Sequence, residues 1–163
     1  MIKAIVFDLD HTLFDRYESL RLVVPRFKDG FCIAEGISDE YIYERLCWAD
    51  KNFVHKGWQE IHAHLCECGI FSEEPTYEEY CRYVVSLLKR MAVPYPFTND
   101  VLSEIRAQGF KMGIITNGEN DTQNNKIDVL GIRDYFDSIV ISGDTPYSKP
   151  DEGIFRLMAD NLQ

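Results

Sequence analysis

Three short runs of apolar residues stand out along the chain, and each run ends in small or polar residues. They cover residues 4–7, 110–115 and 138–141 and are rich in β-branched and aromatic side chains. Continuous apolar runs of this length are typical of parallel strands covered on both faces. Helical patterns over residues 98–108 and 121–130 precede and follow the second run. This alternation predicts an α/β core with a parallel, Rossmann-like sheet.

The segment between the first two predicted strands has helical periodicity and no strand pattern. Thr76 followed by Glu79 is a capping-box signature for the start of one helix. An apolar stripe at helical spacing is formed by Trp58, Ile61, Leu65 and Cys68. We therefore expect two domains: a core of residues 1–14 and 93–163, and an all-helical insertion of residues 15–92.

Composition and charge narrow the class of protein. Hydrophobic residues make up 45% of the 163 residues, which is typical of a globular chain. There are 17 Lys and Arg against 27 Asp and Glu, and this net charge of −10 argues against nucleic acid or an anionic membrane as a partner. The beginning of the chain lacks the long apolar run of a secretory signal. We expect a cytoplasmic protein whose five cysteines are reduced thiols.

The strongest chemical signal is a pair of carboxylates at the end of the first predicted strand. Asp8 and Asp10 are two residues apart, so their side chains leave an extended chain on the same side. Two carboxylates this close are stabilised by a cation between them, and oxygen ligands suit Mg²⁺. An aspartate can also be a covalent nucleophile while a second one shuttles a proton. The alternative is a loop whose acidic residues only form a turn.

The other two strand ends carry complementary groups. Thr116, Asn117 and Gly118 follow the second strand, where a hydroxyl and free amides could hold a phosphoryl oxygen. Lys149 follows the third strand and could neutralise both Asp8 and a phosphate. Each signal has a simpler alternative, a common turn or a solvated lysine. Their combination favours a site, because ligands bind at the carboxyl edge of open parallel sheets.

With these residues in place, the chain resembles the haloacid dehalogenase superfamily, in the branch with a helical cap after the first motif. Residues 8–12 match its first motif, Asp-x-Asp-x-Thr, residues 115–118 the second, and Lys149-Pro150 the third. Further similarity to nucleotidase-like members lies in Gln123, Lys126, residues 130–132, Tyr135, Phe136 and residues 151–155. True dehalogenases of this family lack the second aspartate, so Asp10 favours hydrolysis of a phosphate ester.

The resemblance implies a Mg²⁺-dependent phosphohydrolase that acts on a small phosphorylated metabolite, with the cap closing over the site. Asp8 would be the nucleophile that forms an aspartyl-phosphate, and Asp10 the acid and then the base. Thr116 would hydrogen-bond the phosphoryl group, and Lys149 would hold Asp8. Mg²⁺ would bind the Asp8 carboxylate and the Asp10 backbone carbonyl. Candidate substrate contacts are Thr12, Asn117, Gly118, Phe14 and Arg16, although the last two could equally serve in packing or a salt bridge.

One part of the family pattern is missing. The fourth motif, an acidic pair on a strand that pairs with the first strand, is not found among the 14 residues after Lys149. We therefore expect a sheet that is incomplete on its C-terminal side and a first strand with an exposed edge. The alternative function is that of a truncated, catalytically weak member of the superfamily that binds or self-associates through this edge.

A second cluster of metal-ligand residue types lies within the helical insertion. It consists of His62, His64, Cys66 and Cys68. Residues two apart on a helix point about 200° apart, so these four side chains would not converge. We expect a helix surface here and not a metal site.

Overall fold

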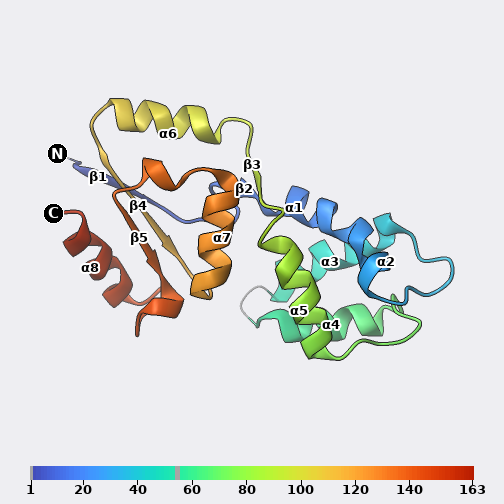
Figure 1. The fold of residues 1–163 in the computed structure, drawn as a ribbon. Coiled ribbons are helices and arrows are strands. Elements are labelled where there is room, and N and C mark those ends of the chain that lie inside the picture. Colours follow the sequence, from blue (N-terminus) through green and yellow to red (C-terminus); the bar gives the residue numbers. More distant parts are fainter. Residues whose placement is uncertain (1, 54–55) are drawn as a thin grey trace. The chain divides into compact units, whose positions relative to one another are not determined.

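The computed structural model describes residues 2–53 and 56–163. Its main sheet has three parallel strands in the order β1-β4-β5: β1 is Ala4–Phe7, β4 is Lys111–Thr116 and β5 is Ser138–Ile141 (Figure 1). In register, Phe7 lies beside Ile114, and Thr116 lies beside Ile141. The predicted α/β fold with a parallel sheet is confirmed. The register also shows why the site forms, since the carboxyl ends of all three strands lie at one edge.

Helices cover both faces of this sheet (Figure 1). Met112 and Ile114 pack on one face with Leu102 of α6 (Thr98–Ala107) and Ile127 of α7 (Asn120–Leu130). The alternate residue Ile115 packs on the other face, in a cluster with the buried residues of α8 (Glu152–Asn161). Residues of β4 therefore alternate between two apolar layers. The strand is a continuous apolar run because both of its faces are covered.

Several shorter elements join these layers. The strands β2 (Phe14–Asp15) and β3 (Val93–Pro94) pair antiparallel as a two-residue ribbon, which the sequence did not predict. The 3₁₀ helices are η1 (Val24–Arg26), η2 (Arg133–Tyr135) and η3 (Ser142–Asp144). The ribbon brings the chain back to the sheet beside the point where it left.

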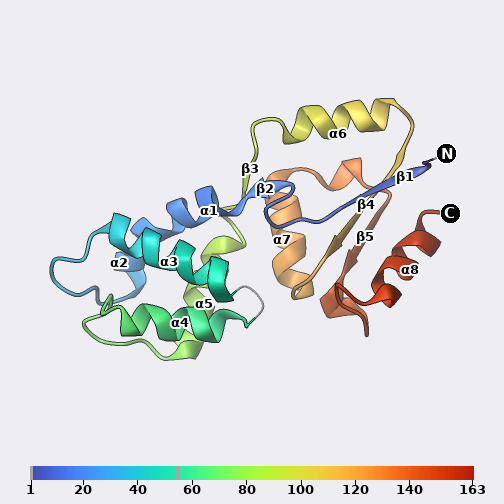
Figure 2. The same ribbon diagram turned by 180° about the vertical axis from the view of Figure 1, so that it is seen from behind.

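The segment between β2 and β3 forms helices (Figure 2). These helices have an apolar core of their own. These are α1 (Arg16–Val23), α2 (Phe27–Gly30), α3 (Asp39–Phe53), α4 (Trp58–Glu67) and α5 (Tyr77–Leu88). The predicted capping box is present, because the Glu79 backbone N–H donates to the Thr76 hydroxyl at 3.3 Å and the Glu79 carboxylate accepts from the Thr76 N–H at 2.9 Å. Ile33 and Phe71 form an isolated antiparallel bridge.

The chain divides into two compact units. The first consists of Met1–Arg16 with Ala92–Gln163, and the second of Tyr17–Met91. Every residue named below as part of the site belongs to the first unit. None of the helices described over residues 2–53 and 56–163 is long and apolar enough to cross a membrane.

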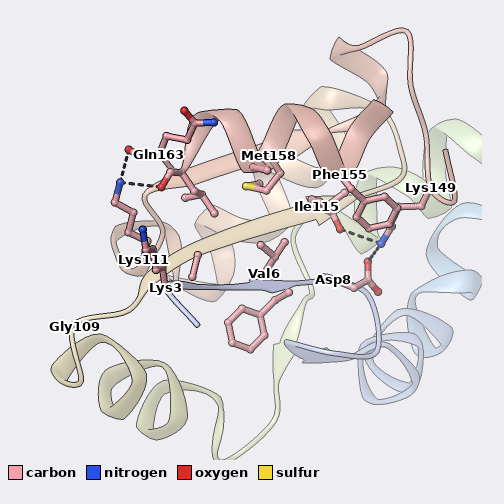
Figure 3. A pocket seen from close by; sticks show the side chains of 14 residues that line it. Lys3, Val6, Asp8, Gly109, Lys111, Ile115, Lys149, Phe155, Met158 and Gln163 are labelled. Carbon is pink, nitrogen blue, oxygen red and sulfur yellow. Dashed lines mark hydrogen bonds and ion pairs between the residues drawn. The ribbon is translucent and has the colours of Figure 1, made fainter. Parts of the chain in front are cut away.

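Strand β1 lies at an edge of the sheet. It pairs with β4 on one side, and the described residues supply no strand on the other. Val6 is 42% exposed there. A largely apolar groove of about 870 Å³ runs between β1 and α8, from the Lys149–Asp8 pair at one end to Lys111 and Gln163 at the other (Figure 3).

Candidate active site

The loop after β1 turns sharply so that its two aspartates leave the core while the residue between them stays in it. Leu9 is fully buried, and its carbonyl accepts hydrogen bonds from the N–H groups of Thr12 at 3.3 Å and Leu13 at 3.0 Å. Within this turn, between Leu9 and Thr12, His11 adopts the left-handed conformation with φ 59°. Successive side chains of an extended chain point to opposite sides, so Asp8 and Asp10 leave the chain on the side opposite Leu9 just before this turn.

Asp8 is paired with the lysine from the third strand end. The Lys149 ammonium contacts the Asp8 Oδ1 atom and also donates to the Ile115 carbonyl oxygen at 3.0 Å (Figure 3). Asn117 fixes the backbone of that lysine: its Nδ2 donates to the Lys149 carbonyl at 3.0 Å, and its Oδ1 accepts from the Lys149 N–H at 2.8 Å. The three strand ends are thus tied together through Lys149, and the expected Asp8–Lys149 contact is present.

Asp10 is held by a different set of groups. Its Oδ1 accepts from Lys126 Nζ at 2.9 Å and from Arg16 at 3.1 Å, and its Oδ2 accepts from Gln123 Nε2 at 2.9 Å. Burial alone would raise the pKa of Asp10. The positive charges of Lys126 and Arg16, with hydrogen bonds from Gln123 and Lys126, outweigh it and lower the pKa to about 2. Asp10 is therefore ionised at neutral pH in this arrangement.

Thr116 reaches the same network through Gln123. Its hydroxyl oxygen lies 2.5 Å from Gln123 Nε2, and its own contact to the Asn117 carbonyl is long, at 3.5 Å. Gln123 accepts from Lys126 through Oε1 at 2.8 Å. The site thus consists of two hydrogen-bonded groups at the strand ends, Asp8 with Lys149 and Asp10 with Gln123 and Thr116.

Sequence reasoning gave Gln123 and Lys126 no role, and the structure places both at the centre of the site. They are 2% and 5% exposed. A signal was available: Ile127 and Leu130 define the buried face of α7, and positions 123 and 126 continue that face by helical spacing. Polar side chains on a buried helix face require partners, and here the partners are the site residues.

The remaining sequence candidates fall into three groups. Gly118, with φ 143°, packs against Gln123 and donates its N–H to the Ser142 hydroxyl at 3.0 Å. Phe14 is buried in the core with the Lys126 ammonium 5.5 Å from its ring centre, and Arg16 forms the ion pair with Asp10. Their surroundings are those of packing and salt-bridge residues. Thr12 and Asn117 lie exposed on the loops, and substrate contact by any of these residues stays a prediction.

The oxygen atoms available at the site suit Mg²⁺ with substrate and water as further ligands. Asp8 offers a carboxylate that is 40% exposed, and Asp10 offers its backbone carbonyl, whereas the Asp10 carboxylate is turned to Lys126 and Arg16. Mg²⁺ commonly binds through one or two carboxylates and retains waters and substrate phosphate oxygens. No group of three His, Cys, Asp or Glu side chains gathers as a metal site in the part of the chain that the structure describes.

The cluster of His62, His64, Cys66 and Cys68 lies on α4 and just after it, where a helix was predicted. His62 lies 3.5 Å from Cys66 Sγ, and His64 lies 3.5 Å from Cys68 Sγ. The two pairs are offset by two residues, about 200° around the helix, so they occupy different faces of it.

Comparisons with known proteins place this geometry in context. The family described as haloacid dehalogenase-like hydrolase matches residues 5–163. The chain is 30% identical over 168 residues to the glyceraldehyde 3-phosphate phosphatase of Methanocaldococcus jannaschii, covering 96% of this chain and 69% of that protein. It is 30% identical over 156 residues to the pyrimidine 5'-nucleotidase YjjG of Escherichia coli, covering 93% and 67%. The magnesium-bound structure described as the HAD-hydrolase YfnB of Bacillus subtilis shares the fold, with a TM-score of 0.73, 20% identity, and coverage of 99% of this chain and 72% of that one.

Proposed function

The chain belongs to the haloacid dehalogenase-like hydrolase family, and we propose that it is a Mg²⁺-dependent phosphatase that acts on a small phosphomonoester through an aspartyl-phosphate intermediate. The observation that carries the proposal is the contact of Asp8 with Lys149 at the strand ends, beside Asp10 and Thr116. Relatives named as phosphatases and nucleotidases support the same reaction class.

The first step transfers the phosphoryl group to the protein. A carboxylate oxygen of Asp8 forms a bond to phosphorus while the bond from phosphorus to the ester oxygen breaks, and Asp10 supplies a proton to the leaving oxygen. Lys149 orients the Asp8 carboxylate and offsets negative charge as the phosphoryl group approaches. The Thr116 hydroxyl donates to a phosphoryl oxygen.

The second step releases phosphate. Asp10, now a carboxylate, takes a proton from water as that water forms a bond to phosphorus, and the bond from phosphorus to Asp8 breaks. Asp10 is ionised in the free protein, which is the state that this base step needs. The acid step requires Asp10 to gain a proton when the negatively charged ester binds nearby, because a like charge raises a carboxyl pKa.

Mg²⁺ would be held by the Asp8 carboxylate and the Asp10 carbonyl, and when bound it would supply positive charge that stabilises the phosphoryl oxygens. The magnesium in the YfnB structure supports this part of the proposal. We expect EDTA to abolish turnover and added Mg²⁺ to restore it.

We further propose that the helical unit of Tyr17–Met91 is a cap that excludes water during turnover. The partner in this proposal is a small phosphorylated metabolite in the cytoplasm.

The test is hydrolysis of p-nitrophenyl phosphate and of a panel of sugar phosphates and nucleoside monophosphates, with Mg²⁺. We expect Asp8→Asn to lose all measurable turnover, since an amide cannot form the intermediate. The matched control is Asp160→Asn, an equal change at an exposed position of α8, which should retain the wild-type rate. Turnover that survives Asp8→Asn would contradict the proposed intermediate.

A second candidate function is self-association, favoured by the open edge of β1. Its unpaired backbone groups and the half-exposed Val6 are available to the same edge of a second copy, which would extend the sheet. A mass that rises with protein concentration would support this function, and a monomer at every concentration would oppose it.

A further inference from the structure

The network around Asp10 contains a glutamine whose orientation is fixed by a lysine. The Lys126 ammonium can only donate, so the Gln123 side-chain group that faces it at 2.8 Å must be the oxygen. The other end of the amide is then the NH₂ group, and it faces Asp10 Oδ2 at 2.9 Å.

With the amide in this orientation, both of its hydrogens are assigned. One points to Asp10 Oδ2 and the other to the Thr116 oxygen at 2.5 Å. The Thr116 hydroxyl therefore accepts from Gln123, and its own hydrogen must point elsewhere. The protein offers it the Asn117 carbonyl at 3.5 Å, which is too long for a strong hydrogen bond.

We propose that Gln123, itself held by Lys126, is a positioning residue that makes the Thr116 hydroxyl a donor toward the transferring phosphoryl group. This inference rests on the proposed function. A phosphoryl oxygen is a far stronger acceptor than a distant carbonyl. The Thr116 hydroxyl therefore donates its hydrogen bond to the phosphoryl oxygen, and no competing protein group has to move. Because the same amide also holds Asp10, one side chain aligns the hydroxyl with the proton-transferring carboxylate.

The packing of Gly118 helps to fix the position of the Gln123 side chain. A Cβ atom on this residue would lie 3.1 Å from both Cγ and Cδ of Gln123. A side chain there would push Gln123 away by a few tenths of an ångström, so glycine lets Gln123 lie in this position at the end of β4. Gln123 and Thr116 are 2% and 1% exposed, so water does not compete for the hydrogen bond between them.

The test is a double-mutant cycle on kcat and KM for p-nitrophenyl phosphate. Gln123→Met keeps the length of the side chain and removes both donors. We expect kcat to fall about tenfold with KM changed by less than about twofold, because the lost interaction acts on the transition state. In a Thr116→Val background the same substitution should cost clearly less than in the wild type, since the hydroxyl it orients is gone and only its hydrogen bond to Asp10 is lost. An unchanged kcat in Gln123→Met, or an equal loss in both backgrounds, would overturn the inference.

A second variant protects the test against loss of folding, which circular dichroism would reveal. Gln123→Glu keeps the shape and the contact with Lys126, but its carboxylate accepts the Thr116 hydrogen instead of leaving it for the substrate. Its kcat should fall at least as far as that of Gln123→Met, and a wild-type kcat would overturn the inference. The matched control is Asn124→Asp, which places the same new charge beside Arg133, whose Nη2 already donates to Asn124 Oδ1 at 2.8 Å. It should leave both constants unchanged.

Binding of orthovanadate, measured by calorimetry with Mg²⁺, separates this inference from the proposed function because it needs no turnover. We expect Gln123→Met to bind vanadate about tenfold more weakly than wild type, and we expect this difference to be smaller in the Thr116→Val background. That result would support the inference even for a chain that hydrolyses nothing in the panel. Equal affinity of Gln123→Met and wild type would overturn the inference while leaving the phosphatase activity established by its own assay. Absence of binding to the wild type, together with no turnover in the panel, would overturn both.

Discussion

The ionisation of Asp10 links a single residue to the stability of the fold. Its pKa is about 2 in the folded protein against 3.8 as the ordinary value, because Lys126 and Arg16 outweigh the effect of burial. A lowered carboxyl pKa contributes stability that is fully present above the unfolded-state pKa and is lost as the pH falls through the folded-state value. At 1.36 kcal/mol per pKa unit, the contribution is about 2 kcal/mol, and its loss belongs to the window from about pH 4 to pH 2.

We therefore expect the difference in unfolding free energy between wild type and Asp10→Asn to shrink across that window. Urea titrations at several pH values measure this difference directly. Other carboxylates cancel in the comparison, including Glu79, whose pKa is lowered by the backbone N–H of Thr76 in both proteins. A difference that stays constant from neutral pH to pH 2 would show that Asp10 is not held by these charges.

Gly118 offers a second prediction at the residue scale. An alanine there would be strained at φ 143° and would press on the Gln123 side chain. We expect Gly118→Ala to lower kcat about tenfold and to destabilise the protein by about 1 kcal/mol. The control is Gly109→Ala, which is strained at φ 79° but meets open space, and which should lower stability without lowering kcat. Equal kcat values for the two variants would contradict a role for Gly118 in seating Gln123.

Residue identity in the sequence revealed only part of this site. Asp8 and Lys149 could be predicted to meet, because both follow strands of one parallel sheet and carry opposite charges. Gln123 and Lys126 could not be given a role, because a helix period shows that they face inward but not which loop they reach. That information comes from the crossover geometry between β4 and β5, which brings α7 over the end of β1.

At the scale of elements, the contact between β4 and α8 depends on the absence of a side chain at Gly113. A Cβ atom there would lie 2.5 Å from the Met158 sulfur and 3.3 Å from Leu162. We expect Gly113→Ala to destabilise the protein by about 1 to 3 kcal/mol, as overpacking does. Met158→Ala alone should cost about 2 to 5 kcal/mol by leaving a cavity. The double variant should cost less than the sum, measured by urea unfolding, and strict additivity would show that α8 is displaced instead.

The strands and long helices were predictable because each has enough residues to show a continuous apolar run or a helical period. The apolar runs gave all three strands of the main sheet, and the spacing of Thr76 and Glu79 gave the start of α5. The ribbon of β2 and β3 was not predictable, since two residues have no period and Pro94 suggests a break. Its pairing is set by the chain entering and leaving the helical unit at neighbouring points.

At the scale of the whole molecule, two units have separate apolar cores. The cluster of the helical unit lies within residues 17–91, and the two clusters beside the sheet lie outside that range. The site residues Asp8, Asp10, Thr116 and Lys149 belong to the sheet unit alone. This division explains why the chemistry of the site could be derived without reference to the helical unit.

The edge of β1 determines the expected behaviour of the whole molecule in solution. Val6 is the half-exposed apolar residue of that strand, and a charge at this position discourages pairing of one edge with another. We expect wild type to gain mass between about 10 µM and 1 mM in light-scattering chromatography, and Val6→Lys to remain monomeric.

Val129→Lys makes the same change in charge at a 47% exposed position of α7, away from the edge, and should associate as wild type does. Because the net charge is −10, any added lysine reduces repulsion between copies, so a monomer produced by Val6→Lys but not by Val129→Lys must arise from the strand edge and not from charge. Association that persists in Val6→Lys would place the contact elsewhere on the surface.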